Sequence, residues 1–288
     1  MFPSRFDYVA PDTVEEVLAT LAQHGDEAKI LAGGQSLIPL MKLRFASPGL
    51  LVDVNRVPGL GFVEETGEHL RVGTLTRNTE LERSALLKSG YPVMADAAPM
   101  ISDPLVRNRG TIGGSLAHAD PAGDWGSVML ALGAEVVIKS STDERTIPVS
   151  ELLVNTFTTS LDPTEMITEI RVPKTPARSG GSYLKMERRV GDFATVATAV
   201  HLTLDNGTIK RAGIGLTAVG SKNLQASAAE DALAGAEPTA EAFEEAARLA
   251  AEASSPSSDV RGSAEYKKAM VRTFVRRGLD KALELARG

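Results

Sequence analysis

Two short glycine pairs constrain this chain more than any other feature. Segments 32–36 (Ala-Gly-Gly-Gln-Ser) and 111–115 (Thr-Ile-Gly-Gly-Ser) share one design, Gly-Gly followed by a polar residue. Glycine has no Cβ and tolerates positive φ, so successive N–H groups can point to one side and bind an anion. Each segment alone is also an ordinary loop sequence. Their repetition predicts two phosphate sites, and hence the diphosphate of a dinucleotide cofactor.

The residues around the first glycine pair support that interpretation. Apolar Ile30 and Leu31 precede it, and an amphipathic run follows at 37–43. This order predicts a strand, a Gly-Gly turn and the start of a helix. Such a turn presents free N–H groups and the positive end of the helix dipole to a phosphate.

Length and composition place the chain in a broad class. A chain of 288 residues is long enough for two or three domains, and its 43% apolar and 24% charged residues fit a globular protein. The net charge of −6, with no basic block, argues against nucleic acid as a partner. No apolar run approaches the ~20 residues that span a bilayer, and the first residues lack the apolar core of a signal peptide. We therefore expect a cytoplasmic protein.

Metal-binding residue types are scarce. The sequence has no cysteine, which excludes disulfides, thiolate zinc sites and cysteine-ligated iron–sulfur clusters within this chain. Of the four histidines, only His118 has carboxylates close by, at Asp120 and Asp124. No His-x-x-x-His pair supports a metal site, so we expect His118 to be a hydrogen-bonding loop residue and expect no metal site.

Local patterns predict the secondary structure of the first two segments. Thr13 with Glu16, and Thr79 with Glu82, are spaced as capping boxes that start helices, and Gly25 is placed to end the first one. Asp124 is placed to cap a helix over 125–132. The predicted strands are 6–9, 29–31, 50–54, 69–73, 135–139 and 167–172, and a further helix is predicted over 91–100. Pro173 and Pro176 indicate a boundary.

The last segment predicts an antiparallel hairpin followed by helices. Asn206-Gly207 separates strand-like runs at 196–204 and 208–219, which is a strong hairpin signal. A strand is predicted over 182–187, and helices over 226–233, 239–253 and 263–286. The string Gly213-Ile214-Gly215-Leu216-Thr217-Ala218 matches a dinucleotide-binding fingerprint, but it lies inside the hairpin with no βαβ unit around it, so we interpret it as a plain strand.

Residues 185–194 (Lys-Met-Glu-Arg-Arg-Val-Gly-Asp-Phe-Ala), taken with both glycine pairs, carry a family resemblance. The chain resembles the FAD-binding medium subunits of molybdenum hydroxylases, of the aerobic carbon monoxide dehydrogenase type and related to the flavin domain of xanthine dehydrogenase. The resemblance covers essentially the whole chain. It implies an α+β protein with a PCMH/vanillyl-alcohol-oxidase-type FAD-binding fold in two subdomains, 1–57 and 58–176. A C-terminal domain of antiparallel sheet and helices, 177–288, follows.

The resemblance also implies roles for individual residues. The diphosphate is expected at 32–36 and 111–115, the adenosine ribose at Asp124, the polar edge of the flavin at Lys185, and the ring near Asp192 and Phe193. From sequence alone, Phe193 fits ring stacking and a place in the core about equally well. No catalytic residue is assigned. The implied cofactor-binding residues are Lys29, Leu31, Ala32, Gly33, Gly34, Gln35, Ser36, Leu37, Ile101, Thr111, Ile112, Gly113, Gly114, Ser115, His118, Asp120, Asp124, Leu161, Lys185, Asp192 and Phe193.

The implied function is electron transfer. FAD in this chain would take electrons from [2Fe-2S] clusters of a small subunit, which receive them from a molybdenum cofactor in a large subunit, and pass them to an external acceptor. The assembly would be a dimer of heterotrimers. Ser115 stands where family members often carry Asn, and its hydroxyl still offers a donor to phosphate. Gln35 stands where the carbon monoxide enzymes often have His, so N-heterocycle and aldehyde or xanthine-type hydroxylases remain alternatives. A stand-alone FAD oxidase and a non-catalytic nucleotide-binding protein are the other two. Arg107, Arg109, Arg188 and Arg189 are expected to help hold the acidic cofactor, face a partner, or simply lie on the solvated surface.

Overall fold

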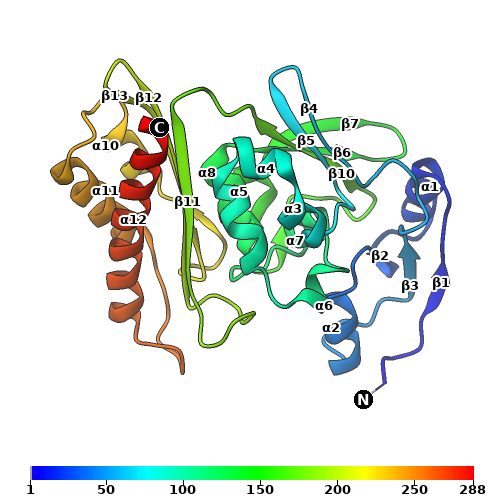
Figure 1. Cartoon of the computed structure of the whole chain (residues 1–288). Coiled ribbons are helices and arrows are strands. Elements are labelled where there is room, and N and C mark those ends of the chain that lie inside the picture. The colour runs from blue at the N-terminus through cyan, green and yellow to red at the C-terminus, as the bar shows by residue number, and fades with distance from the viewer. Residues whose placement is uncertain (1) are drawn as a thin grey trace.

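The computed structural model describes residues 2–288 and places its three larger β-sheets one after another along the molecule, besides a two-stranded sheet over 153–159 (Figure 1). Each of the three larger sheets has its own hydrophobic core, formed with the helices that cover it. The mixture of one parallel sheet with antiparallel sheets and separate helices is the predicted α+β class. Among residues 2–288, no helix has both the length and the apolar composition needed to cross a membrane.

The N-terminal sheet is parallel and has the strand order β1-β3-β2. Its first helix starts where Thr13 Oγ1 accepts the Glu16 N–H (3.2 Å) and ends at Gly25 with φ +51°, so both predicted helix limits are confirmed. Val17, Leu21 and Val52 join helix and sheet in one core. The elements are β1 (Asp7–Val9), α1 (Val14–His24), the 3₁₀ helix η1 (Gly25–Glu27), β2 (Ala28–Leu31), α2 (Leu37–Leu43) and β3 (Leu50–Asp53).

The central sheet is antiparallel, with the order β4-β5-β10-β6-β7. Helices pack against it around the buried Trp125, whose Nε1–H donates to Asn78 Oδ1 (2.8 Å). The elements up to the second glycine pair are β4 (Val63–Thr66), β5 (His69–Gly73), α3 (Asn78–Arg83), α4 (Ala85–Gly90), α5 (Pro92–Ala97), η2 (Ala98–Met100), α6 (Pro104–Arg107) and α7 (Ile112–His118). Those that follow are α8 (Asp124–Leu132), β6 (Glu135–Lys139), β7 (Glu144–Pro148), α9 (Val149–Leu152), β8 (Leu153–Asn155), β9 (Thr158–Thr159) and β10 (Met166–Pro173).

One helix start in this region differs from the prediction. The capping box assigned to Thr79 and Glu82 is wrong, because the helix begins earlier, with Arg77 at its N-cap and Glu80 Oε2 accepting the Arg77 N–H (2.8 Å). The expected single helix is two, because Ser84 takes an extended conformation and caps α4. The helix that starts at Arg77 places Leu81 in the core, fully buried.

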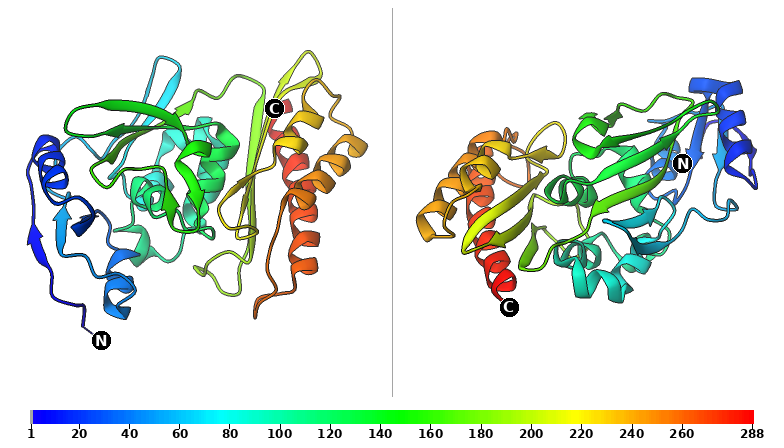
Figure 2. Two further views of the ribbon diagram at one scale, coloured as in Figure 1. Left: turned by 180° about the vertical axis from the view of Figure 1, so that it is seen from behind. Right: turned by 90° about the horizontal axis from the view of Figure 1, so that it is seen from above.

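The C-terminal sheet lies between helices on both faces (Figure 2). Its strand order is β11-β12-β13-β14, α11 and α12 cover one face with α10, and α8 of the central region packs on the other. The hairpin turn is as predicted, with Asn206 and Gly207 at positive φ. The elements are β11 (Ser179–Met186), β12 (Val196–Asp205), β13 (Thr208–Thr217), β14 (Leu224–Gln225), α10 (Ser227–Leu233), α11 (Ala240–Ala253) and α12 (Ala264–Arg287).

The glycines of the fingerprint-like string have a packing role. They lie in β13, as interpreted from the sequence, where α8 crosses the sheet. A Cβ on Gly213 would come within 1.8 Å of the Ala131 carbonyl oxygen, and one on Gly215 within 2.0 Å of the Ser127 carbonyl oxygen. Glycine here allows close contact between helix and strand, rather than a nucleotide turn.

Candidate functional site

The first glycine pair forms a turn with a row of unpaired amides. Gly34 has φ +74°, the left-handed region that glycine adopts without strain, and the turn connects β2 to α2 as predicted. Within the described residues, the N–H groups of Gly33 to Leu37 donate to no backbone or side-chain acceptor. Five neighbouring donors on partly exposed residues form a site suited to an anion with several acceptor oxygens.

The second glycine pair differs from the prediction, because Gly113 and Gly114 lie inside helix α7 rather than in a turn. Thr111 caps this helix, and its Oγ1 accepts the Gly114 N–H (3.1 Å). The Gly113 N–H donates to the Thr74 carbonyl (3.0 Å), and a Cβ on Gly113 would come within 1.8 Å of Thr74 Oγ1. Gly113 therefore lets the helix approach Thr74 closely, and the free donors of the site belong mainly to the first turn.

The two glycine segments are immediate neighbours in space. A Cβ on Gly114 would lie 3.8 Å from Ala32 Cβ, and one on Gly110 would lie 3.9 Å from Gln35 Cγ. Gly33 sits against the same stretch, where a Cβ would come within 2.4 Å of the Arg109 carbonyl oxygen. Ser115 also lies close to Gly123, because a Cβ on Gly123 would be 3.8 Å from Ser115 Oγ. Residues some 80 positions apart thus form one surface.

His118 and Asp120 lie at the far end of α7. The His118 ring packs against Phe157, with 4.9 Å between the centroids and a tilt of 33° between the planes. Burial lowers the pKa of His118, Asp120 raises it and Lys29 lowers it further. Asp120 accepts the Ala122 N–H (2.9 Å) in a turn. The charge of Lys29, on β2, thus reaches the end of α7.

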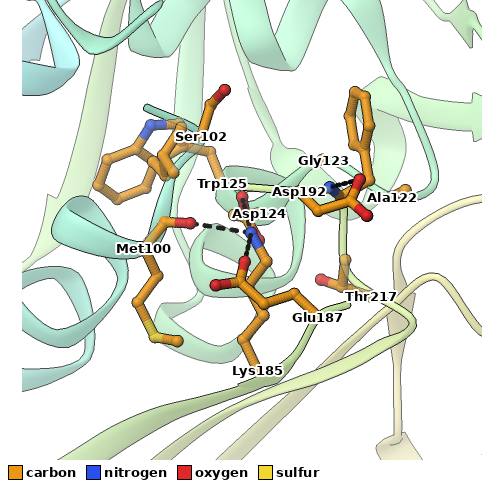
Figure 3. A network of polar contacts seen from close by, with 12 residues as sticks. Met100, Ser102, Ala122, Gly123, Asp124, Trp125, Lys185, Glu187, Asp192 and Thr217 are labelled. Carbon is orange, nitrogen blue, oxygen red and sulfur yellow. Dashed lines mark hydrogen bonds and ion pairs between the residues drawn. The ribbon is translucent and has the colours of Figure 1, made fainter. Parts of the chain in front are cut away.

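A buried polar cluster joins the central region to the C-terminal sheet (Figure 3). Lys185 Nζ donates to the Met100 carbonyl (2.8 Å) and to Asp124 Oδ2 (3.2 Å), while the Tyr183 hydroxyl donates to Asp124 Oδ1 (2.6 Å). Glu187 Oε2 lies 3.6 Å from Lys185 Nζ and has no hydrogen-bond partner.

Asp124 is therefore held on both carboxylate oxygens. Burial raises its pKa, and Lys185 and Tyr183 oppose that rise. The prediction that Asp124 caps the helix over 125–132 is wrong: Asp124 is the first residue of α8, and its side chain turns to β11 instead. The fully buried Tyr183 hydroxyl has a pKa raised well above its ordinary value, by burial and by Asp124. No sequence signal points to Tyr183, because a tyrosine in a strand is usually a packing residue.

Asp192 and Phe193 belong to the loop after β11. Arg261, which precedes α12, binds both of them: Nη2 lies 3.0 Å from Asp192 Oδ1, and Nη1 donates to the Phe193 carbonyl (2.7 Å). Arg261 lowers the pKa of Asp192, after the larger effect of the Phe193 N–H. The Phe193 side chain is 54% exposed, so it is free of the core and its face is available to a ligand.

The remaining predicted residues line the edges of this region. The Ile101 carbonyl accepts a hydrogen bond from Arg107 Nη1 (3.2 Å), and Leu161 packs against the central core that contains Ile112. Gly191 lies against Ser102, the residue after Ile101, because a Cβ on Gly191 would be 3.1 Å from the Ser102 carbonyl carbon. The loop of Asp192 and Phe193 therefore rests on the segment that follows Met100, beside the buried cluster.

Two contributors to the glycine surface were missed from sequence. Asn55 donates to the Ala32 carbonyl (2.9 Å), and Arg77 donates to the Arg109 carbonyl. A signal for Asn55 exists, since it closely follows the strand that ends at Asp53, where polar side chains at the end of a parallel strand tend to meet a ligand. Arg77 lies outside every motif of the sequence.

The surface fits the diphosphate of a dinucleotide. The five unpaired N–H groups offer neutral donors to phosphate oxygens, and the arginines and Lys29 around them add positive charge. The half-exposed Phe193 face is suited to an aromatic ring system. The arrangement can bind a long ligand with an anionic middle and an aromatic end.

Comparison with known proteins agrees with this geometry. Residues 4–175 match the domain family described as FAD binding domain in molybdopterin dehydrogenase, and residues 181–282 match the CO dehydrogenase flavoprotein C-terminal domain. The chain is 44% identical over its full length to the 6-hydroxypseudooxynicotine dehydrogenase complex subunit alpha of Paenarthrobacter nicotinovorans, covering 97% of that protein. It is 40% identical to the carbon monoxide dehydrogenase medium chain of Hydrogenophaga pseudoflava, over 98% of both chains. The solved carbon monoxide dehydrogenase from H. pseudoflava superposes with a TM-score of 0.95 at 43% identity, over 99% of both chains.

Proposed function

The chain belongs to the family of FAD-binding medium subunits of molybdenum hydroxylases, and from that premise we propose that it binds FAD and transfers electrons within a larger enzyme. The observation that carries the proposal is the row of five unpaired amides from Gly33 to Leu37, beside Gly114 of helix α7. These amides would hold the diphosphate, with Thr111 to Ser115 forming the opposite wall. Lys185, Asp192 and Phe193 would lie toward the flavin end.

The composition of the chain supports a transfer role. Bound FAD supplies a carrier that accepts two electrons and releases them singly or in pairs. Because the sequence contains no cysteine, the [2Fe-2S] clusters must belong to another polypeptide, and we place them in a small subunit and the molybdenum cofactor in a large one. The dimer of heterotrimers, the external acceptor, the cytoplasmic location and the boundaries 1–57, 58–176 and 177–288 are parts of the same proposal.

Two substrate classes are open for the whole assembly. We propose the aerobic carbon monoxide dehydrogenase type, which the 40% identity to a carbon monoxide dehydrogenase medium chain supports. The 44% identity to a subunit of the 6-hydroxypseudooxynicotine dehydrogenase complex favours a second candidate, a hydroxylase of an organic substrate such as an N-heterocycle. Reduction of an artificial dye by the assembly purified from its native source, with carbon monoxide or 6-hydroxypseudooxynicotine as electron donor, separates the two.

Cofactor binding is tested with a matched pair of glycine variants. Gly34 (φ +74°) lies in the amide turn and Gly235 (φ +78°) lies in a remote turn with open space around it. Gly34→Ala and Gly235→Ala impose similar backbone strain, but the Cβ of Gly34→Ala would also lie 2.7 Å from Ile38 Cδ1. The melting temperature of each variant is therefore measured as well, and a loss of FAD affinity counts for the site only where it exceeds the loss of stability. We expect wild type and Gly235→Ala to show the flavin spectrum after incubation with FAD, and Gly34→Ala to bind FAD at least tenfold more weakly.

The outcomes also separate the alternative functions. A wild-type chain that carries no flavin and gains none from added FAD contradicts the proposal. Turnover of an organic substrate by the isolated, FAD-loaded chain supports the stand-alone oxidase instead. Bound FAD that no partner subunit reduces in stopped-flow mixing supports a non-catalytic nucleotide-binding protein.

A further inference from the structure

Asn55 connects the end of β3 to the glycine turn. Its Nδ2 donates to the Ala32 carbonyl (2.9 Å) and to Asp53 Oδ1 (2.5 Å), and its backbone N–H also donates to Asp53 Oδ1 (2.9 Å). Asp53 in turn accepts the Tyr8 hydroxyl (2.7 Å). Asn55 is thus held in place at the end of the parallel sheet. Its side chain binds the carbonyl of Ala32, the residue before the row of unpaired amides.

Arg77 continues the connection to the other glycine segment. Its Nη2 donates to Asn55 Oδ1 (2.5 Å), and its Nη1 donates to the Arg109 carbonyl. The backbone of Arg77 is also fixed, because it pairs with Thr111 in an isolated antiparallel bridge. The Arg77 side chain is partly buried, and this burial together with nearby Arg109 lowers the pKa of the guanidinium.

The two side chains close a ring around the base of the turn. The ring runs from Ala32 through Asn55 and Arg77 to the Arg109 carbonyl, and Gly33 packs against that same carbonyl, leaving no room for a Cβ. The amides above the ring have no acceptor within the described residues, so no hydrogen bond of their own orders them. An outer ring of hydrogen bonds can supply that order before a ligand arrives, which lowers the conformational cost of binding.

We propose that Asn55 and Arg77 are positioning residues for the FAD diphosphate: their shared hydrogen bond fixes the Gly33-Gly34 turn against Arg109-Gly110, so that the amides of the turn are ordered for binding. The inference rests on the proposed function. Neither residue needs to touch FAD; each acts through the turn. Because the bond between them is the link in the ring, loss of either side chain opens it, and loss of both opens it no further.

The test is a double-variant cycle on the full chain, stripped of flavin and titrated with FAD while flavin fluorescence is measured. Asn55→Ala and Arg77→Met are each expected to weaken FAD binding about tenfold, as one or two lost hydrogen bonds would. The double variant is expected to be only about as weak as either single one, rather than a hundredfold weaker. Arg77→Lys, which keeps a charged donor, should recover part of the loss.

A matched arginine controls for stability. Arg145 also bridges two partners, Glu165 and the Ser160 carbonyl, but it lies on β7, in the central sheet. Arg145→Met should lower the melting temperature of the chain while leaving the Kd for FAD within twofold. If Asn55→Ala does not fold, Asn55→Ser, which keeps a small polar side chain, takes its place in the cycle.

The possible results are distinguishable. Single variants within twofold of wild type, or losses that multiply in the double variant, overturn the positioning role and leave the proposed function intact. Losses that follow melting temperature in all variants, Arg145→Met included, also overturn it, because they indicate a general structural effect. A wild-type chain that binds no FAD overturns both proposals.

Discussion

Lys185 Nζ lies 3.2 Å from Asp124 Oδ2, with the Lys185 side chain wholly shielded from solvent and that of Asp124 nearly so. The pair connects β11 of the C-terminal sheet to the first residue of α8, two segments about 60 positions apart. Lys185 Nζ donates a further hydrogen bond to the Met100 carbonyl. One buried cation therefore links the C-terminal sheet to α8 and to the end of η2.

Removal of this cation is expected to destabilise the protein strongly. Lys185→Met leaves Asp124 and Glu187 as buried carboxylates without a counterion, which costs about 3–5 kcal/mol. Lys139→Met is the control, because Lys139 and Glu144 form an exposed pair (2.8 Å) worth about 1 kcal/mol or less. Urea unfolding followed by circular dichroism measures both. Equal losses in the two variants would show that the buried pair has no special role.

His201 predicts a pH dependence of stability. Its side chain is buried in β12, and burial, helped by Arg211, lowers its pKa to about 3. In the unfolded chain His201 has an ordinary pKa of about 6.5, so below that pH it binds a proton that it does not bind in the folded chain. The free energy of unfolding therefore falls as pH falls from 6.5 toward 3. His201→Gln should remove about 1 kcal/mol per pH unit from the slope in this window, measured by urea unfolding between pH 7 and 4. An unchanged slope would mean that His201 takes up a proton in the folded protein.

Gly213 is expected to tolerate no side chain. The Cβ of Gly213→Ala would overlap the Ala131 carbonyl of α8, and relief of that overlap must separate helix from strand at a cost of about 3 kcal/mol or more. Gly90→Ala, in a helix with open space, should change stability by no more than about 1 kcal/mol. Thermal unfolding compares them. A stable Gly213→Ala protein would contradict the close packing of α8 on β13.

FAD removal should lower thermal stability. A ligand that binds only the folded state at a hundred times its Kd adds about 3 kcal/mol, so saturating FAD should raise the melting temperature by several degrees. ADP, which carries the same diphosphate without the flavin, should produce a smaller rise, because the amide turn can still bind it. Melting curves of the stripped chain with each ligand, and with adenosine as the control, measure this. A rise with adenosine as large as that with ADP would argue against diphosphate binding by the turn.

The local features of the site were predictable, but several of their partners were not. The strand–turn–helix order around Gly33 and Gly34, the end of α1 at Gly25 and the Asn206-Gly207 hairpin depend on residues close together in the chain. The second glycine pair was misjudged, because Gly-Gly fits a turn and the first turn of a helix equally, and the close approach of Thr74 favours the helix. The prediction that Asp124 caps a helix was wrong for a similar reason, since Lys185 and Tyr183 bind its carboxylate instead of the helix N–H groups.

Residue types and short spacings were enough to predict the family, the α+β class, the amide turn and the absence of thiolate ligands. The distant groups that complete the site became visible only in the folded chain: Asn55 and Arg77 under the glycine turn, and Lys185 on Asp124. A buried polar side chain must find a hydrogen-bond partner within about 3 Å, and the packing of sheets and helices determines which group lies that close.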